Sequence, residues 1–169
     1  YIDKNNINND LVHGWEHPDI PLRQRVLVHQ ELTAMYKGLP ARVYSIAAES
    51  MRNYLKNGST LLEIGCSSGY YSEVLEYILG KSFSYTGIDI SQAFITMAES
   101  YYPGNIFTVA DAKNLPFSQS SFDIVFSSGA ILYEIDYAKH IKESSRVARN
   151  VLIYHRTPIC RQRETQILK

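Results

Sequence analysis

The sequence predicts an α/β domain in which helices cover both faces of a mostly parallel, doubly wound sheet. From residue 59 onward, short apolar segments typical of buried strands alternate with amphipathic segments typical of helices. Glycine or a carboxylate follows the first three strand-like segments, as expected at the ligand-binding edge of an open α/β sheet. The expected strands are residues 60–64, 83–88, 105–109, 121–127 and 151–155.

The region before the first strand predicts a helical cap rather than a separate domain. Residues 1–19 are rich in asparagine and aperiodic. Pro21 is suited to open a first helix, with one expected face at Leu22, Val26, His29, Thr33 and Tyr36. A second helix follows Pro40, with side chains three and four apart at Tyr44, Ala47, Ala48, Met51 and Leu55. We therefore divide the chain into a lead and cap, residues 1–58, and an α/β domain, residues 59–169.

Three further helices are expected between the strands. The first covers residues 71–79 and is closed by Gly80. The second begins after Ser91, a residue type that caps helix N-termini, and ends before Pro103. The third covers about residues 136–148, and its inward positions are expected to be Ile141 and Val147.

The turn after the first strand is the centre of the expected ligand site. Residues 61–72 read LLEIGCSSGYYS, so Glu63 lies near the end of an apolar strand, and Gly65 and Gly69 follow it. Glycine allows conformations and close backbone approach that side chains obstruct. The helix that opens after Tyr70 would direct N–H groups to the same place, where they favour a carboxylate.

Carboxylates also follow the second and third strands. Asp89 follows the second strand within the segment YTGIDI, residues 85–90, and Asp111 comes soon after the third strand. A carboxylate can accept hydrogen bonds from both hydroxyls of a ribose, because it has two acceptor oxygens. The fourth strand, FDIVFS, ends at Ser127. Because the carboxyl ends of parallel strands share one edge, we expect these residues to form one site.

These strand ends together resemble the class I S-adenosylmethionine-dependent methyltransferases over about residues 59–155. The resemblance implies a Rossmann-like sheet of strand order 3-2-1-4-5, S-adenosylmethionine as cofactor and S-adenosylhomocysteine as product. Such sheets usually finish with an antiparallel hairpin. The sequence after Arg156 does not show its pattern, and residues 164–169 look like the start of a helix. The resemblance implies cofactor contacts from Glu63, Gly65, Cys66, Gly69, Tyr70, Asp89, Ile90, Asp111, Ala112 and Ser127.

Within this resemblance, the loop of residues 65–70 would hold the methionine half of the cofactor. Glu63 would help to hold the loop and lie near the amino group, and Ser127 would lie beside the methionine portion. The family often has a third glycine where this chain has Ser67. We expect serine to be able to replace this glycine if its φ is negative.

The resemblance assigns the nucleoside half to the next two strand ends. Asp89 would accept the ribose hydroxyls, and Ile90 would flank the adenine. The Asp111 carboxylate would accept from the adenine amino group, and the N–H of Ala112 would donate to a ring nitrogen. A nicotinamide-binding site fits less well, because its glycine pattern requires glycine where this chain has Ser67 and Tyr70.

The amino-acid composition limits the kinds of partner that we expect for this protein. The chain has 169 residues with 17 basic and 17 acidic side chains, and it has no basic block, so a nucleic-acid partner is not indicated. We see no membrane-span pattern and no signal peptide, and we expect a cytoplasmic protein without a membrane partner. Cys66 and Cys160 lack metal-ligand spacing, so we expect reduced thiols and no metal site.

Methyl transfer from an activated sulfonium mainly requires in-line alignment and exclusion of water. A base is needed only where the acceptor must lose a proton. Our first candidate is His155, at the end of the fifth strand; Tyr133 and Glu134, after the fourth strand, are weaker candidates. Arg156 could hold an anionic group of the acceptor. The alternative is that His155 has no catalytic role and is a histidine at a strand end that is hydrogen-bonded to the backbone.

The acceptor is inferred by exclusion. An Asn-Pro-Pro-Tyr sequence after the fourth strand would indicate an amide or base nitrogen in protein or nucleic acid, but this chain has SSGA at residues 127–130. We therefore expect a small-molecule acceptor. Two alternatives stay open: a non-catalytic cofactor-binding or scaffold domain, and an aminopropyltransferase. A homodimer is also open.

Overall fold

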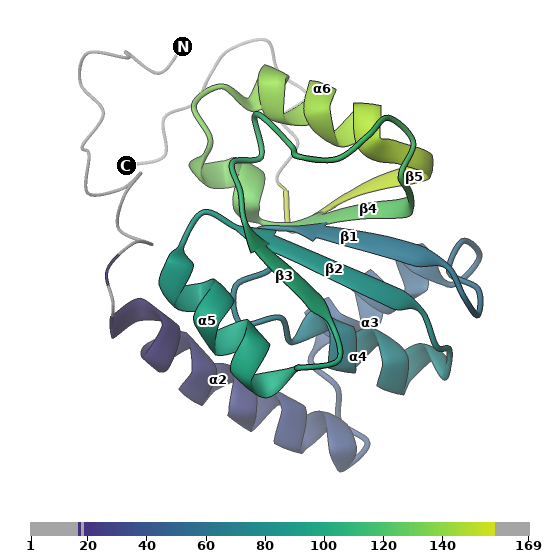
Figure 1. The fold of residues 1–169 in the computed structure, drawn as a ribbon. Coiled ribbons are helices and arrows are strands. Elements are labelled where there is room, and N and C mark those ends of the chain that lie inside the picture. Colours follow the sequence, from purple (N-terminus) through teal and green to yellow (C-terminus); the bar gives the residue numbers. More distant parts are fainter. Residues whose placement is uncertain (1–16, 18, 158–169) are drawn as a thin grey trace, which may run out of the picture.

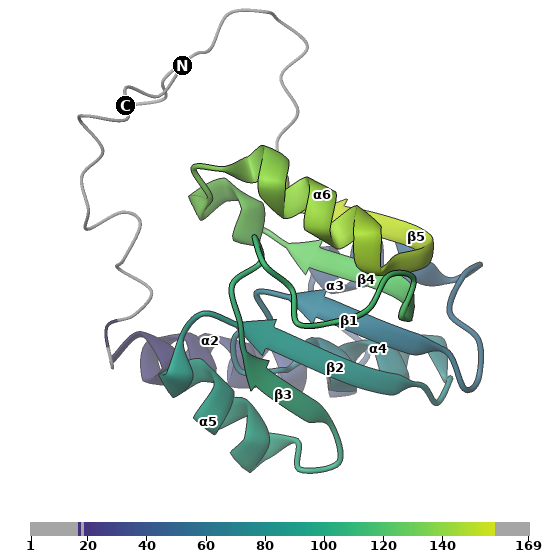
Figure 2. The ribbon, with the colours of Figure 1, turned by 45° about the horizontal axis from the view of Figure 1, so that its top comes forward.

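The computed structural model describes residue 17 and residues 19–157, and its centre is a five-stranded sheet (Figures 1 and 2). All neighbouring strands are parallel, and their order, β3-β2-β1-β4-β5, confirms the predicted order. The strands are β1 (Thr60–Ile64), β2 (Ser84–Asp89), β3 (Ile106–Val109), β4 (Phe122–Ser128) and β5 (Ala148–His155).

Helices cover both faces of the sheet. One face is covered by α2 to α5, and the opposite face by α6 and the loop that precedes β4 (Figure 2). The helices are α2 (Asp19–Tyr36), α3 (Arg42–Met51), α4 (Tyr71–Leu79), α5 (Gln92–Tyr101) and α6 (Tyr137–Val147), with a 3-10 helix η2 (Ala130–Tyr133) before α6. Among the described residues, none of the helices is both long and apolar enough to cross a bilayer.

The central strand β1 contributes to both hydrophobic layers because successive side chains point to opposite faces. Leu61 packs into the layer shared with α2 to α5, whereas Leu62 packs into the layer shared with α6. Both side chains are fully buried. Burial on both faces explains why the strand reads as an unbroken apolar run, and it fixes the strand's carboxyl end beneath the site.

Helix α2 buries a different face from the one that the sequence predicted. Its buried apolar side chains are Val28, Leu32 and Met35, whereas Leu22 and Val26 are 63% and 60% exposed. The buried stripe joins the layer that also holds Leu61, so packing on the α/β core determines the rotation of the helix. The boundary at residue 58 stays a prediction.

Helix α6 also differs from the prediction. Val147 is buried as expected, but Ile141 is 39% exposed, and the inward positions are taken by His140 and Ser144. The Ser144 hydroxyl donates to the carbonyl oxygen of His140 at 2.7 Å, which satisfies one of these polar groups inside the helix. The buried face of α6 therefore carries a histidine, where we expected the aliphatic side chain of Ile141 to make the contact.

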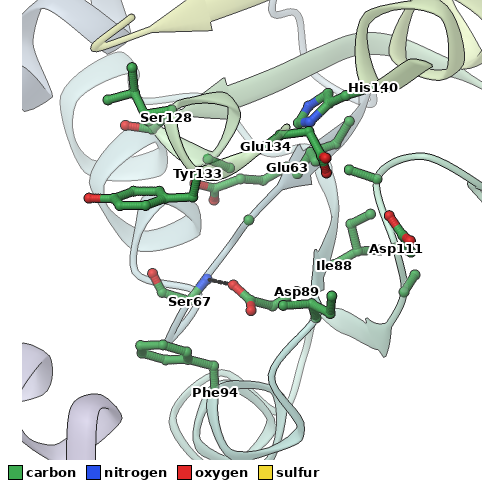
Figure 3. A pocket seen from close by; sticks show the side chains of 18 of the residues that line it. Glu63, Ser67, Ile88, Asp89, Phe94, Asp111, Ser128, Tyr133, Glu134 and His140 are labelled. Atoms are coloured by element: carbon green, nitrogen blue, oxygen red, sulfur yellow. Dashed lines mark hydrogen bonds between the residues drawn. The ribbon is translucent and has the colours of Figure 1, made fainter. Parts of the chain in front are cut away.

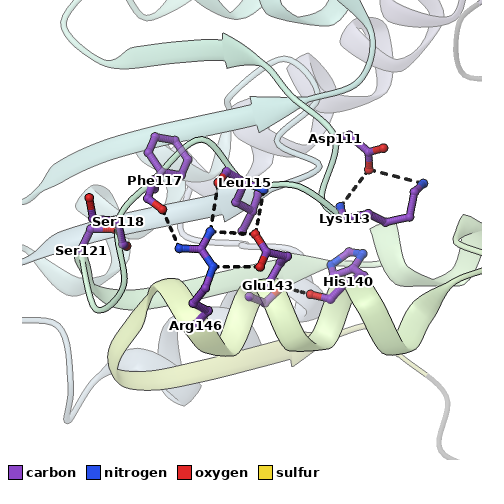
Figure 4. Close-up of polar contacts among 10 residues, drawn as sticks. Asp111, Lys113, Leu115, Phe117, Ser118, Ser121, His140, Glu143 and Arg146 are labelled. Atoms are coloured by element: carbon purple, nitrogen blue, oxygen red, sulfur yellow. Dashed lines mark hydrogen bonds and ion pairs between the residues drawn. The ribbon is translucent and has the colours of Figure 1, made fainter.

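The loop before β4 is held against α6 by hydrogen bonds to an ion pair on that helix (Figure 4). Glu143 and Arg146 pair at 2.7 Å, and Glu143 accepts from the N–H of Leu115 at 3.0 Å. Arg146 donates to the carbonyl oxygens of Leu115 and Phe117 at 3.0 and 2.7 Å. These bonds fix the path of the chain immediately after Asp111.

We expect Glu143→Gln to lower the free energy of unfolding by about 1 kcal/mol near neutral pH, through weaker bonds to the loop and to Arg146. Hydrogen bonding from Arg146 lowers the pKa of Glu143 to about 2, from 4.5. Because the folded value lies below the unfolded one, the stabilisation is complete above about pH 4.5 and is lost as the pH falls toward 2. Urea denaturation should show the difference between the two proteins shrinking over this range.

The matched control is Glu49→Gln. Glu49 forms a similar i,i+3 pair with Arg52 at 2.7 Å, but its side chain is 70% exposed, compared with 16% for Glu143. Exposed pairs contribute little. An equal loss in both variants would contradict the anchoring role of Glu143.

Candidate functional site

A cavity of about 550 Å³ lies at the carboxyl ends of β1, β2 and β4 (Figure 3). Parallel α/β sheets bind ligands at this edge, where the strand order reverses between β1 and β4. Its walls bring together these predicted residues: Glu63, Gly65, Tyr70, Asp89, Ile90, Asp111, Ala112 and Tyr133. Arg156 and Glu134 also line the cavity.

The turn after β1 passes close to the segment after β4. Gly65 has φ +74°, and a Cβ atom there would lie 2.5 Å from the Cβ of Ala130, so only glycine fits. Ser67 has φ +48°, so the negative φ on which our expectation for serine depended is not found. The bond from its N–H to Asp89 Oδ2, at 2.9 Å, holds this left-handed conformation.

Asp89 joins two loops at the floor of the cavity. Oδ2 accepts from the Ser67 N–H, and Oδ1 accepts from the Ser91 N–H at 3.0 Å. Ser91 is the N-cap residue of α5, as predicted, although its side chain makes no capping hydrogen bond. Burial raises the pKa of Asp89, whereas the bonds from these backbone N–H groups oppose the rise. Each carboxylate oxygen can accept further bonds from a ligand hydroxyl.

Glu63 is a buried carboxyl at the wall of the cavity, 1% exposed. Burial raises its pKa well above the usual value, the hydrogen bond from the Tyr85 hydroxyl lowers it, and the Asp89 charge raises it. A buried carboxylate needs a partner for its charge. A cationic group that enters the cavity beside Glu63 would favour the ionised form.

A lysine joins the two loops at the far side of the cavity. Lys113 Nζ lies 3.4 Å from Asp111 Oδ1 and 2.9 Å from Glu134 Oε2. The same Asp111 oxygen accepts from the Lys113 N–H at 2.8 Å. The loop after β3 and the segment after η2 are therefore connected across the cavity wall.

Three predicted cofactor residues do not line the cavity. Cys66 and Gly69 face inward and support the turn, because a Cβ atom at Gly69 would lie 2.7 Å from Phe107 Cζ. Ser127 is fully buried, and its neighbour Ser128 lines the cavity instead. Strand β4 continues one residue further than predicted, and the alternation of side chains assigns the outward position to Ser128.

His155 lies behind the cavity wall. It is 8% exposed, its ring stacks on Phe126, and its Nδ1 lies 3.2 Å from Ser128 Oγ. Burial lowers its pKa, and the positive charge of Arg156 lowers it further. Ser128 lines the cavity and is hydrogen-bonded to His155, which does not line it.

Sequence reasoning missed Gln24, Ser128 and His140 among the cavity residues. Gln24 reaches the site from α2 and donates to Ser67 Oγ at 3.0 Å. A lone glutamine in a cap helix carries no motif, so this contact depends on how α2 packs. His140 is next to Ile141 in the sequence. A prediction that placed His140, Ser144 and Val147 on the inward face of α6 would have found it.

The cavity suits a polar organic ligand of mixed charge. Within the described residues, the buried atoms Gln24 Oε1 and His140 Nε2 lack hydrogen-bond partners, and both residues line the cavity. Buried polar atoms of this kind normally have partners. The described part of the chain holds no group of three or more His, Cys, Asp or Glu side chains that could bind a metal. The glycine turn, the carboxyls and these two atoms fit an adenosyl amino acid.

A parallel sheet of order 3-2-1-4-5, with a glycine turn after β1 and carboxylates after β2 and β3, defines the class I S-adenosylmethionine-dependent methyltransferases. Residues 62–151 match the family described as "Methyltransferase domain", and the chain belongs to this family.

Curated relatives include a phthiotriol/phenolphthiotriol dimycocerosates methyltransferase of Mycobacterium tuberculosis. It is 35% identical over 94 residues, 54% of this chain and 34% of that protein. A 2-methyl-6-phytyl-1,4-hydroquinone methyltransferase of Synechocystis is 34% identical over 110 residues, 63% of this chain and 34% of that protein. The chain thus spans about a third of the length of these relatives.

Solved structures agree on the fold. A SAM dependent methyltransferase from Aquifex aeolicus is 20% identical with a TM-score of 0.54, over 63% of this chain and 61% of that one. The [4+2]-cyclase SpnF is 26% identical with a TM-score of 0.56, over 64% of this chain and 40% of that one.

Proposed function

We propose that the protein transfers a methyl group from S-adenosylmethionine to a small, largely apolar acceptor. The observation that carries this proposal is the single cavity shared by Gly65, Glu63, Asp89 and Asp111. When bound, S-adenosylmethionine supplies an activated methyl on a sulfonium. The chain's own residues bind and orient the two reactants and exclude water.

Each part of the cavity fits one part of the cofactor. Glu63 would accept the charge of the amino group, and the turn at Gly65 would let the backbone approach the methionine half. Asp89 would accept the ribose hydroxyls. Asp111 and Ala112 would contact the adenine edge, with Ile90 against its face. Tyr70 lines the cavity at the start of α4 and would close the methionine side.

An apolar acceptor is supported by the rim of the cavity. Leu132, Tyr133 and Ile135 line it and are 50%, 46% and 38% exposed, so hydrophobic surface faces outward beside the site. The names of the two curated relatives denote lipid and prenylated hydroquinone substrates. Arg156, also at the cavity, could hold a polar or anionic group of the acceptor.

For a hydroxyl acceptor, Ser128 and His155 form the proton path that the structure supports. The acceptor would give its proton to Ser128 Oγ as the Ser128 proton passes to His155 Nδ1, 3.2 Å away. Burial and Arg156 lower the His155 pKa, so the imidazole is neutral and able to accept a proton.

Titration calorimetry of the full chain with S-adenosylhomocysteine tests the cofactor assignment. We expect micromolar binding, with competition by S-adenosylmethionine. Methyl transfer should then be assayed from labelled cofactor to a panel of lipophilic phenols and hydroquinones. Failure of the full chain to bind either adenosyl compound would falsify the assignment.

We expect Ser128→Ala and His155→Phe each to lower kcat about a hundredfold on a hydroxyl acceptor, because each interrupts the proton path. In His155→Phe, affinity for S-adenosylhomocysteine should change less than about twofold, since His155 does not line the cavity. The double variant should have nearly the same kcat as either single variant, because each substitution already interrupts the same proton path. Additive losses would contradict a shared role.

A further inference from the structure

His140 has a buried ring nitrogen that neither the fold nor the proposed reaction uses. The residue is 1% exposed, lies on the inward face of α6 and lines the cavity. Its Nε2 atom is buried and has no hydrogen-bond partner among the described residues. An unsatisfied buried polar atom destabilises the fold, and a hydrogen-bond donor on a ligand in the cavity would remove that cost.

His140 lies at the same end of the cavity as Asp111. Figure 4 shows its side chain beside the loop that carries Asp111 and Lys113, and Figure 3 shows it across the cavity from Ser67. The charges of Glu134, Lys113 and Asp111 all act on the ring, although burial dominates and lowers the His140 pKa. The imidazole is therefore neutral, and with its proton on Nδ1 the Nε2 atom is an acceptor.

The exocyclic amino group of adenine has two hydrogens and can donate to two acceptors. Asp111 can supply one, but its Oδ1 already accepts from the Lys113 N–H and lies near Lys113 Nζ. A second acceptor at this end of the cavity can come from another element. Helix α6 offers His140 Nε2 there.

We propose that His140 Nε2 accepts a hydrogen bond from the 6-amino group of the cofactor's adenine and so helps to select adenine over a 6-oxo purine. This role rests on the proposed function, because it requires the adenosyl group in this cavity. It makes His140 a specificity-determining residue contributed by α6, in addition to the loops after β2 and β3.

The test compares S-adenosylhomocysteine with S-inosylhomocysteine, whose purine carries oxygen in place of the amino group. We expect His140→Phe to weaken binding of the adenosyl compound about 3- to 10-fold and to change binding of the inosyl compound less than about twofold. His140→Gln, which returns an acceptor near the Nε2 position, should keep the preference for adenine within about threefold of the original value.

Tyr154→Phe is the matched control. The Tyr154 ring packs beside His140 with centroids 5.9 Å apart, but Tyr154 does not line the cavity. It should leave the ratio of the two affinities unchanged. An unchanged ratio in His140→Phe, with normal binding by the unaltered chain, would overturn the role of His140 and leave the cofactor site intact. If the unaltered chain bound neither compound, both proposals would fail.

A measurement on the unaltered chain covers the case in which His140→Phe does not fold. The ¹⁵N shift of His140 Nε2 should move on addition of S-adenosylhomocysteine, in the direction of an accepted hydrogen bond. It should move less with S-inosylhomocysteine. Equal shifts with both compounds would contradict the proposal.

Discussion

Replacing Asp89 with alanine should weaken S-adenosylhomocysteine binding by about 2–3 kcal/mol, or about 30- to 150-fold. A carboxylate that accepts ligand hydroxyls forms charge-assisted bonds, which are stronger than neutral ones. The substitution also frees the N–H groups of Ser67 and Ser91, which Asp89 holds at 2.9 and 3.0 Å. Calorimetry gives the affinity, and urea denaturation gives the separate cost to stability.

An analogue of S-adenosylhomocysteine without the ribose hydroxyls separates the direct contact from the loop effect. If Asp89 binds the hydroxyls, this analogue should bind both proteins with nearly the same affinity. If Asp89 only positions the loop, Asp89→Ala should weaken the analogue and the parent compound equally. The second outcome would remove the ribose role and leave the structural one.

The sheet could be predicted from the sequence because each strand has a local signal. A short, mostly apolar run such as residues 60–64 is typical of a strand buried on both faces, and residues such as Gly65 and Asp89 mark the strand ends. Every expected strand is present, with ends shifted by a few residues. The order of the strands came from the resemblance and not from periodicity.

What could not be predicted depends on rotations and one-residue shifts. Ending β4 at Ser128 instead of Ser127 exchanges which serine reaches the cavity, because side chains alternate along a strand. The rotation of α6 about its axis places His140, and not Ile141, on the buried face. The position of Gln24 depends on how α2 packs against the core. Tertiary packing determines these details, and no local pattern reports them.

Gly65→Ala should be among the most damaging single substitutions at this site. Alanine at φ +74° costs about 1–2 kcal/mol from backbone conformation alone. Its Cβ would also lie 2.5 Å from Ala130 Cβ, so the turn after β1 or the segment after β4 must move, at a further cost of about 1–3 kcal/mol. Both segments line the cavity, so S-adenosylhomocysteine affinity should fall as well.

Two variants separate the conformational cost from the steric one. Gly58 has φ +82° with no atom within 4 Å of its added Cβ, so Gly58→Ala should show the conformational cost without the clash and keep normal cofactor binding. Ala130→Gly removes the atom that the new Cβ would meet. The double variant Gly65→Ala/Ala130→Gly should therefore regain about 1–2 kcal/mol of stability and part of the binding relative to Gly65→Ala. If Gly58→Ala were as harmful as Gly65→Ala, or if Ala130→Gly gave no rescue, the close approach of these two segments would not be what requires glycine at this turn.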